Sequence, residues 1–364
     1  MGQTAARRSA GEERAAELSD AGEVDSARRT VEAVWRIEAA RVIAGLVRVV
    51  RDVGLAEDLA QDALVAALEQ WPQSGVPDNP GAWLTAVARR RGVDVIRRRA
   101  TLDRKIEELS RDLTGIETPM DDIEIGPAVP DDVLRLMFIA CHPVLPAEAR
   151  VALTLKMIGG LTTEEIARSY LVPVSTMAQR IVRAKKALRA AQVPFEMPVG
   201  AALAERLASV LEVVYLIFNE GYAATSGPTW TRPALCDEAM RLGRIVCGLA
   251  PRESEAFALV ALMELQASRL RARVAADGSP ITLLDQDRAR WDRLLIDHTL
   301  AALAHAQELG GAGPYFLQAS IAACHAQARS VADTDWVRIA GLYRALVDLT
   351  DSPVVELNRA VAVG

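Results

Sequence analysis

The spacing of small apolar residues constrains the fold of this chain more than any other feature of its sequence. They recur every three or four positions, as in Leu59, Ala63, Ala66 and Ala67, which is the period of one face of an α-helix. Composition agrees: aromatic residues make up only 4%, and strands favour aromatic and β-branched side chains, whereas the abundant Ala, Leu and Arg favour helices. The sequence therefore predicts an all-α protein.

Length and composition set further bounds. A chain of 364 residues with 51% hydrophobic and 25% charged side chains is expected to form two or three globular domains. Its four cysteines lack paired spacing, which argues against a disulfide framework or a multi-cysteine zinc module and is typical of a reducing, cytoplasmic compartment. The sequence has no long uncharged apolar run and no signal-peptide core, so we expect no membrane association.

Charge is unevenly distributed along the chain. Trp83–Lys105 carries eight Arg and Lys against two Asp, and Val174–Gln192 carries five basic residues and no acidic ones. Between them, Ile106–Asp132 carries nine acidic residues against one Arg, and Ala201–Gly364 is mildly acidic, although the net charge of the whole chain is only −6. This pattern predicts two anion-binding surfaces separated by an acidic linker.

Interruptions rich in Gly and Pro divide the chain. We expect a helix over about 30–50 and a second helix over about 56–70. The first has a broad stripe of Val34, Ile37, Ala40, Arg41, Ala44 and Val47. The predicted organisation is a mobile tail at 1–27, a helical domain at 28–100, an acidic linker at 101–130, a second helical domain at 131–192 and a multi-helix extension at 193–364.

Residues 162–190 have the pattern of a helix-turn-helix. A short helix with a capping box at Thr162–Glu165 precedes a turn and a longer basic helix. The expected shared core is Ile166, Leu171, Val174, Met177 and Ile181, and the expected outer face is Ser175, Thr176, Ala178, Gln179, Arg183 and Lys186. Gln and Arg pair with base edges in the major groove, whereas Arg180, Lys185 and Arg189 suit phosphate contacts or solvated charge. An ordinary helical hairpin with a basic surface has the same pattern.

The segment Asn79–Arg99 is a second basic element. Asn79 and Pro80 are typical of a helix N-cap and first helical residue, after a Pro-rich loop expected at Trp71–Pro80. The Arg-rich face can neutralise phosphates, and Trp83 can stack on a base. A solvated basic face with Trp83 in the core explains the same residues. We expect this helix to end near residue 100.

The segment Glu57–Asp62 is acidic. Its residues Asp58, Gln61 and Asp62 lie at positions i, i+3 and i+4, so they share one helix face. Such a face can dock a basic partner protein, or it can be solubilising charge.

In this order, the three features resemble one family, the bacterial RNA polymerase sigma factors of the extracytoplasmic-function (ECF) type. Glu57–Leu64 resembles the region that binds the clamp helices of the largest polymerase subunit. Trp83–Arg89, with Asp94 and Arg97-Arg98, resembles the segment that opens and reads the −10 promoter element. Leu161–Leu188 resembles the domain that reads the −35 element, so the resemblance covers about half the chain.

The resemblance implies a fold with two small helical sigma domains. It also implies that the protein binds core RNA polymerase and promoter DNA. The implied polymerase-binding residues are Asp58, Gln61 and Asp62. The implied −10 residues are Asn79, Trp83, Arg89, Arg90, Arg97 and Arg98, with flipped bases held by the loop Trp71–Pro80. The implied −35 residues are Ser175, Thr176, Ala178, Gln179, Arg180, Arg183 and Lys186. One departure from the family is that Arg90 and Arg91 stand where an Asn often follows.

The extension after residue 192 also has a counterpart in the family. The phrases Leu216–Tyr222, Asp285–Arg288, Gly313–Tyr315 and Ser352–Ala360 resemble a subgroup with a long helical, tetratricopeptide-like C-terminal extension. In that subgroup the extension takes the place of a separate anti-sigma protein. We expect six to eight helices here, and an intramolecular contact that fixes the spacing of the sigma domains or masks them. Because the sequence stops inside a helical pattern, we also expect it to be truncated.

The sequence offers little support for an enzyme. Asp285 and Asp287, with His298 or His305, contain acid–base groups, but i, i+2 spacing puts the two carboxylates on different helix faces. No phosphate loop or nucleophile elbow accompanies them. We therefore predict no catalytic residue and no cofactor.

Two further interpretations concern metals and rival functions. Cys141-His142 is expected to serve as core and cap rather than as metal ligands, so no metal site is predicted. The alternative function is a helix-turn-helix regulator that uses only 131–192 and never binds polymerase. A helical scaffold that binds neither DNA nor polymerase is a third hypothesis.

Overall fold

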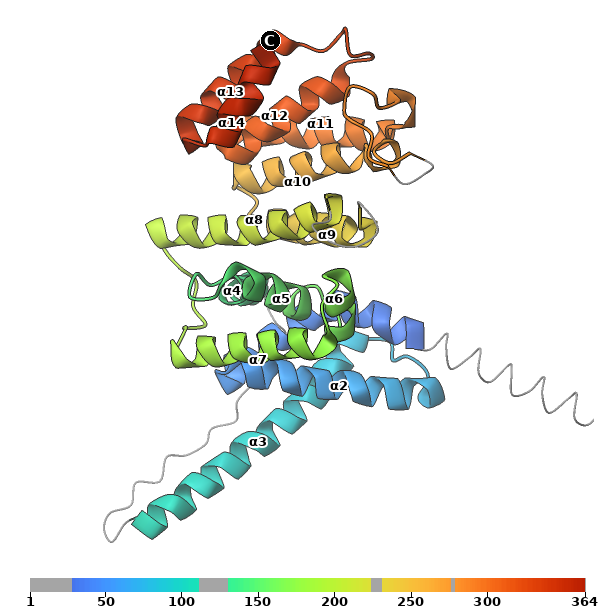
Figure 1. Cartoon of the computed structure of the whole chain (residues 1–364). Helices are drawn as coiled ribbons and strands as arrows, with labels where there is room; N and C mark the ends of the chain where they lie inside the picture. The colour runs from blue at the N-terminus through green and yellow to red at the C-terminus, as the bar shows by residue number, and fades with distance from the viewer. Residues whose placement is uncertain (1–27, 111–129, 224–230, 276–278, 364) are drawn as a thin grey trace, which may run out of the picture. The chain divides into compact units, whose positions relative to one another are not determined.

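The computed structural model describes residues 28–110, 130–223, 231–275 and 279–363 (Figure 1). Within these ranges the regular elements are helical, and strand-type pairing is confined to one bridge between Val274 and Pro280. The predicted all-α class is confirmed. The predicted tail at 1–27 and most of the predicted acidic linker lie outside the described residues. Among the helices described, none has the length and apolar character needed to cross a membrane.

The described residues form two compact units whose segments alternate along the chain. The first unit contains the described residues up to Ala140, together with Leu155–Thr162 and Ile181–Met197. The second contains Cys141–Thr154, Thr163–Arg180 and the described residues from Pro198 onward.

The first unit is built on four helices. They are a helix at 28–50, α2 (Val53–Ser74), α3 (Pro80–Ser110) and α4 (Pro130–Ala140). Small side chains allow these helices to approach closely, and the predicted stripe of α2, namely Leu59, Ala63, Ala66 and Ala67, is buried as expected. At the start of α4, the buried Asp132 carboxylate forms two ion pairs. The Arg135 guanidinium lies 2.6 Å from it, and the Arg48 guanidinium of helix 28–50 lies 3.4 Å from it. This pairing ties the end of the acidic segment to the first helix.

The buried face of helix 28–50 is broader than the predicted stripe. Ala40, Ala44 and Val47 are buried as expected, whereas Ile37 is 65% exposed. Four residues outside the predicted stripe, Trp35, Ala39, Ile43 and Leu46, are also almost fully buried. The large Trp35 side chain extends the apolar face beyond the predicted positions.

The connection between α2 and α3 is shorter than predicted. Trp71, expected in a loop, is buried inside α2, and Pro72 follows within the helix, which ends where Gly75 adopts a φ of 81°. Asn79 caps α3 as predicted, because its Oδ1 accepts from the backbone N–H of Ala82 at 3.0 Å. The helix α3 then continues to Ser110 rather than ending near residue 100.

The second unit includes the helix-turn-helix region. The elements are α5 (Ala147–Met157), α6 (Thr163–Ser169) and α7 (Val174–Ala190), and the division between the two units falls within α5 and α7. The helix α6 begins directly after Thr162, where the capping box was predicted.

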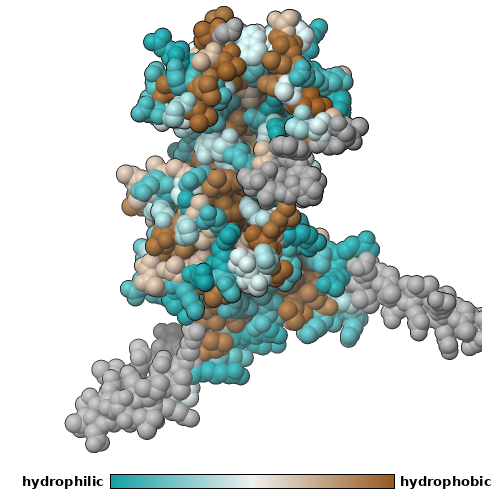
Figure 2. Space-filling view, in the orientation of Figure 1, coloured by the Kyte–Doolittle hydropathy of each residue, from teal (hydrophilic) through white to brown (hydrophobic). Residues whose placement is uncertain are grey.

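The extension adds seven α-helices and two 3₁₀ turns among its described residues, within the predicted range. They are α8 (Ala201–Tyr222), α9 (Pro233–Leu249), α10 (Ser254–Ala267), η1 (Leu270–Ala272), η2 (Arg288–Arg290), α11 (Arg293–Glu308), α12 (Pro314–Gln327), α13 (Trp336–Thr350) and α14 (Pro353–Val363). The helix α10 is central, because it packs against α8, α9, α11 and α12 and is buried along most of its length. The last helices expose apolar side chains, including Val337, Val354 and Leu357, and Figure 2 shows apolar groups on this part of the molecule.

Gly221 lies in the last turn of α8, one residue before the helix ends at Tyr222, and is buried. A Cβ there would lie 2.7 Å from the backbone N of Cys236 and 2.9 Å from Leu235 Cβ. Glycine therefore permits the close approach of α8 and α9.

Candidate nucleic-acid interface

The helix α7 buries one face and exposes the face predicted to contact DNA. Met177, Ile181, Ala184 and Leu188 recur at helical spacing and are buried. The predicted −35 residues Ser175, Thr176, Gln179, Arg183 and Lys186 are exposed, and Ala178 and Arg180 are half-buried. The outer face of α7 is thus polar and basic, with side chains long enough to reach base edges.

Two residues of the predicted helix-turn-helix core are not in it. Leu171 is 51% exposed and Val174 is 45% exposed, while Ile166 is fully buried. Leu171 has a φ of 51°, and the N–H of Val172 donates to Ala167 O at 3.0 Å, which closes the C-terminal turn of α6. The left-handed conformation at Leu171 reverses the chain and leaves its side chain in solvent.

A groove of about 750 Å³ lies along the first half of α3. It gathers four of the six predicted −10 residues, Asn79, Arg89, Arg90 and Arg97. Helix 28–50 contributes two residues to the groove that sequence reasoning missed, Glu38 and Arg41, which are paired at 3.3 Å. The basic lining suits a nucleic-acid strand, whose phosphates carry the complementary charge.

Trp83 is not among the residues that line the groove, and it is partly a core residue. Its ring meets the buried Trp71 ring edge to face, with centroids 5.3 Å apart and an interplanar angle of 66°. Trp83 itself is half-buried. Trp71 therefore fixes one side of Trp83 and leaves part of the ring available for stacking. Arg98 is exposed further along α3 and is not in the groove lining.

The predicted polymerase-binding residues lie on α2, and two of them are paired with basic side chains. Asp58 accepts from Lys185 Nζ of α7 at 2.9 Å, and Asp62 lies 3.3 Å from the Arg91 guanidinium of α3. Both carboxylates keep more than half of their side-chain surface exposed, and Gln61 between them is half-buried. These ion pairs give the acidic face of α2 partners within the first unit. Its contact with polymerase stays a prediction.

The same end of α2 holds a larger set of charges, here called the α2–α7 cluster. It consists of Asp52, Glu57 and Asp58 facing Lys156, Lys185 and Arg189. Lys185 donates to Glu57 as well as to Asp58, Arg189 donates to Asp52, and Lys156 Nζ lies 3.6 Å from Glu57 Oε1. Burial on its own lowers the pKa of Lys185, but Glu57 and Asp58 more than offset it, and the net pKa is raised.

Sequence reasoning missed most of this cluster. Glu57 was treated as part of an exposed acidic block, but only 3% of its side chain is exposed. A signal was present in Lys156, a single cation in an otherwise apolar run, because a buried Lys requires an acidic partner. Asp52 also caps α2 by accepting from the Leu55 N–H at 3.0 Å.

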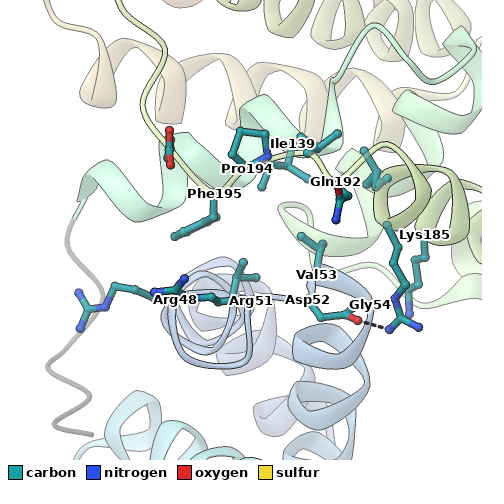
Figure 3. A pocket seen from close by; sticks show the side chains of 15 residues that line it. Arg48, Arg51, Asp52, Val53, Gly54, Ile139, Lys185, Gln192, Pro194 and Phe195 are labelled. Carbon is teal, nitrogen blue, oxygen red and sulfur yellow. Dashed lines mark hydrogen bonds and ion pairs between the residues drawn. The ribbon is translucent and has the colours of Figure 1, made fainter.

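A pocket of about 680 Å³ opens beside the cluster (Figure 3). Its walls come from helix 28–50, the start of α2, the ends of α4 and α7, and the segment after α7 that carries Pro194 and Phe195. Figure 3 shows Asp52 and Lys185 on the same side of this pocket, with an ion pair drawn at Asp52. The pocket combines Arg48 and Arg51 with apolar side chains.

In the second unit, α8 of the extension is hydrogen-bonded to the helix-turn-helix region. Arg150 of α5 donates to Ser209 at 2.9 Å and to Glu212 at 2.8 Å, and Ser209 donates to the carbonyl of Cys141 at 2.7 Å. Arg232 donates to the carbonyl of Ser169, at the end of α6, at 2.6 Å. The extension is thus joined to α5 and α6 by polar contacts at several points.

The polar cluster at Asp285–Trp291 has a structural role. Asp287 caps η2 by accepting from the Ala289 N–H at 2.9 Å. Buried Arg288 donates to the carbonyls of His325 and Ala328 at 2.9 and 2.7 Å, and it lies 5.0 Å from the Trp291 ring centroid. These contacts hold the end of α12.

Cys141 and His142 occupy the places predicted for core and cap. Cys141 lies 3.2 Å from Thr154 Oγ1, and burial raises the pKa of its thiol to about 12. His142 Nδ1 accepts from the Val144 N–H at 3.0 Å, and burial together with Arg206 lowers its pKa to about 4. Over the described ranges of the chain, no group of three or more His, Cys, Asp or Glu side chains is arranged to hold a metal ion.

Three known families match successive parts of the chain. Sigma-70 region 2 matches residues 36–101, and Sigma-70 region 4 matches residues 135–188. A family of unknown function, DUF6596, matches residues 206–307 within the extension. No solved structure matches the chain significantly.

Individual relatives agree with this order. Uncharacterized protein R00370 of Rhizobium meliloti strain 1021 is 45% identical over 324 residues, which is 89% of this chain and 77% of that protein. ECF RNA polymerase sigma factor SigK of Mycobacterium bovis is 29% identical over 153 residues, 41% of this chain and 78% of SigK. Probable ECF RNA polymerase sigma factor SigI of Mycobacterium tuberculosis is 29% identical over 165 residues, and the match spans 45% of this chain and 56% of SigI.

A helix-turn-helix with an exposed basic recognition helix, preceded by a helical domain with an Arg-lined groove, defines a DNA-binding protein of transcription. The matches to regions 2 and 4, in that order, make the class specific. The chain belongs to the ECF sigma factors, which direct transcription initiation by RNA polymerase, and the predicted family is confirmed. Membership in this family implies binding to core RNA polymerase and promoter DNA. Sigma factors as a family are not enzymes.

Proposed function

We propose that this sigma factor reads the −10 element with the groove of α3 and the −35 element with the outer face of α7. The observation that carries the proposal is the groove, where Asn79, Arg90 and Arg97 meet Arg41 of another helix. A melted strand in this groove would have its phosphates neutralised by arginines and a base stacked on the free side of Trp83. On α7, Gln179 and Arg183 supply direct base contacts.

We further propose that Asp58, Gln61 and Asp62 bind core polymerase. This proposal is supported by the position of the three residues on one face of α2, where both carboxylates are exposed. Basic groups of the polymerase would take the place of Lys185 beside Asp58 and of Arg91 beside Asp62. The extension is proposed to regulate or stabilise the sigma domains by intramolecular contact. The hydrogen bonds of Arg150 and Arg232 support that contact.

Transcription with purified core polymerase on fragments of the host genome tests the proposal. We expect new transcripts that start at a fixed distance from a shared two-part motif. Arg183→Ala should weaken discrimination at one −35 position by about 1–3 kcal/mol, because one bidentate base contact is lost. Arg90→Ala should weaken binding to all promoters and reduce the salt dependence by about one phosphate contact.

Arg252→Ala is the matched control, because Arg252 is exposed in the extension and belongs to neither proposed surface. It should leave transcription unchanged. Absence of transcripts together with failure to co-elute with core polymerase would contradict the proposal and favour a helix-turn-helix regulator.

A further inference from the structure

A small pocket lies where the helix-turn-helix region meets the extension, and it is called here the α5–α8 pocket. Its walls come from α5, α6, α7 and α8, and its volume is about 220 Å³. All of its lining residues belong to the second unit, so the structure places both sides of the pocket together. A molecule bound there would contact the DNA-reading region and the extension at once.

The inner wall of the pocket is apolar. Val151, Ala152, Ile166 and Met177 are buried, and Leu216 of α8 is 36% exposed beside them. Such a wall favours the apolar body of a ligand, because binding removes apolar surface from water. The volume is below the roughly 300–1,000 Å³ of sites for drug-sized ligands. The pocket therefore suits a compact molecule.

The polar groups of the pocket leave one cation without a partner. Arg180 of α7 is half-buried, and its side chain forms no ion pair or hydrogen bond with the parts of the chain that the structure describes. Glu220, in contrast, is paired with Arg232. Glu148 is exposed, where water and salt screen its charge. The wall also contains Ala147 at the start of α5, a helix end with partial positive charge.

Tyr170 adds a hydroxyl group to the same wall. Its oxygen is buried and has no hydrogen-bond partner. Burial, and then Glu220, raise the pKa of this phenol, so it stays neutral and can donate a hydrogen bond. An acceptor that reaches the hydroxyl, after a small shift of the side chains that cover it, would satisfy a donor left unpaired in the free protein.

We propose that the α5–α8 pocket binds a compact apolar carboxylate, with its apolar body on the inner wall and its carboxylate paired with Arg180. Arg180 is also one of the predicted −35 residues. The bound carboxylate would compete with a promoter phosphate for the same guanidinium, because both are anionic oxygen acceptors. Binding of the ligand should therefore weaken binding to the −35 element. This regulatory effect rests on the proposed function, whereas binding of the ligand does not.

Isothermal titration calorimetry on the full chain tests ligand binding. The probes are benzoate, cyclohexanecarboxylate and hexanoate. Acetate lacks the apolar body, and benzyl alcohol lacks the charge. We expect a Kd below about 1 mM for at least one probe, and affinities at least about tenfold weaker for acetate and benzyl alcohol. Absence of binding by all three probes, or equal binding of benzyl alcohol and benzoate, would overturn the proposal.

Substitutions in the pocket locate the bound probe. Arg180→Met should weaken probe binding at least about tenfold, because a charge-assisted hydrogen bond is lost, and Arg180→Lys should retain part of the affinity. Arg252→Met, at an exposed position outside the pocket, is the matched control and should leave probe binding unchanged. Unaltered probe affinity in both Arg180 variants, with the fold intact by circular dichroism, would contradict the assignment.

The hydroxyl contact has its own test. Tyr170→Phe removes only the oxygen and should weaken probe binding by about two- to tenfold, which corresponds to one hydrogen bond. Tyr343→Phe is the control, because Tyr343 is likewise half-buried but lies on α13, outside the pocket. Equal affinities in the two variants would rule out Tyr170 as a ligand contact.

Binding to a duplex that carries the −35 element tests the competition. Saturation with the probe should weaken duplex binding several-fold and reduce its salt dependence by about one phosphate contact. In Arg180→Met the probe should have no such effect. Unchanged duplex binding by the probe-saturated protein would overturn the competition. Failure of the probe-free protein to bind the duplex or to initiate transcription would instead overturn the proposed function.

Discussion

At the scale of the residue, backbone approach and burial decide which positions tolerate change. Gly221 and Gly248 both lie in helices of the extension, but only Gly221 faces another helix at close range. The first is required by packing, because a Cβ there would lie 2.7 Å from the backbone N of Cys236 in α9. The second meets nothing within 4 Å, so its flexibility serves no contact.

This contrast gives a paired prediction. Gly221→Ala should lower the free energy of unfolding by about 1–3 kcal/mol, because the new methyl group overpacks the α8–α9 contact. Gly248→Ala should raise it by up to about 0.5–1 kcal/mol through helix propensity. Urea unfolding followed by circular dichroism measures both. Equal effects of the two substitutions would show that α8 and α9 do not approach as closely as described.

At the scale of the element, the joint between α12 and α13 contains an aromatic contact with a buried imidazole. His325 at the end of α12 packs edge to face on Trp336 at the start of α13, with centroids 5.4 Å apart. Burial, then Arg269 and Arg288, lower its pKa from 6.5 to about 4. The joint therefore requires a neutral imidazole.

The sign of the pH effect follows from this pKa. As pH falls, the unfolded chain binds the proton near 6.5 while the folded chain resists it until about 4. The stabilising contribution of neutral His325 is therefore complete above pH 6.5 and is lost as pH falls toward 4. His325→Phe should reduce the loss of stability over this window by about 1–2 kcal/mol, allowing for solvent screening.

Thermal unfolding at several pH values measures this difference. A parallel pH dependence for His325→Phe and the unmodified protein would rule out His325 as a contributor.

At the scale of the whole molecule, the extension's contact with α5 and α6 is the feature to test. Arg150→Met removes hydrogen bonds to Ser209 and Glu212 while keeping an aliphatic side chain of similar length. We expect a loss of about 1–3 kcal/mol in stability and faster proteolysis of the segment between α7 and α8. Arg252→Met, on an exposed position, controls for loss of an arginine.

The functional counterpart is a variant that ends near Gln192. If the extension regulates the sigma domains, this shortened protein should differ from the full chain in transcription with core polymerase on the same promoter fragments. Identical promoter output from the two proteins, at equal folded concentration, would show that the extension has no regulatory role.

The sequence by itself determined what depends on near neighbours in the chain. Helical periodicity predicted the fold class, Asn79 and Pro80 marked the start of α3, and the spacing along α7 separated its buried from its exposed side chains except at Val174. These features are local, because a cap or a helical face is set within a few residues. The order of the three motifs was likewise enough to indicate the family.

Only the tertiary structure decided which distant residues meet. It buried Trp35 outside the predicted stripe, placed Arg41 in the groove, required Gly221 between α8 and α9, and paired Glu57 with Lys156 and Lys185. No periodicity links such positions. Their pairing follows from how the helices pack. Charged side chains that the sequence suggests are solvated then become buried, and a buried charge requires an ion pair or hydrogen bonds.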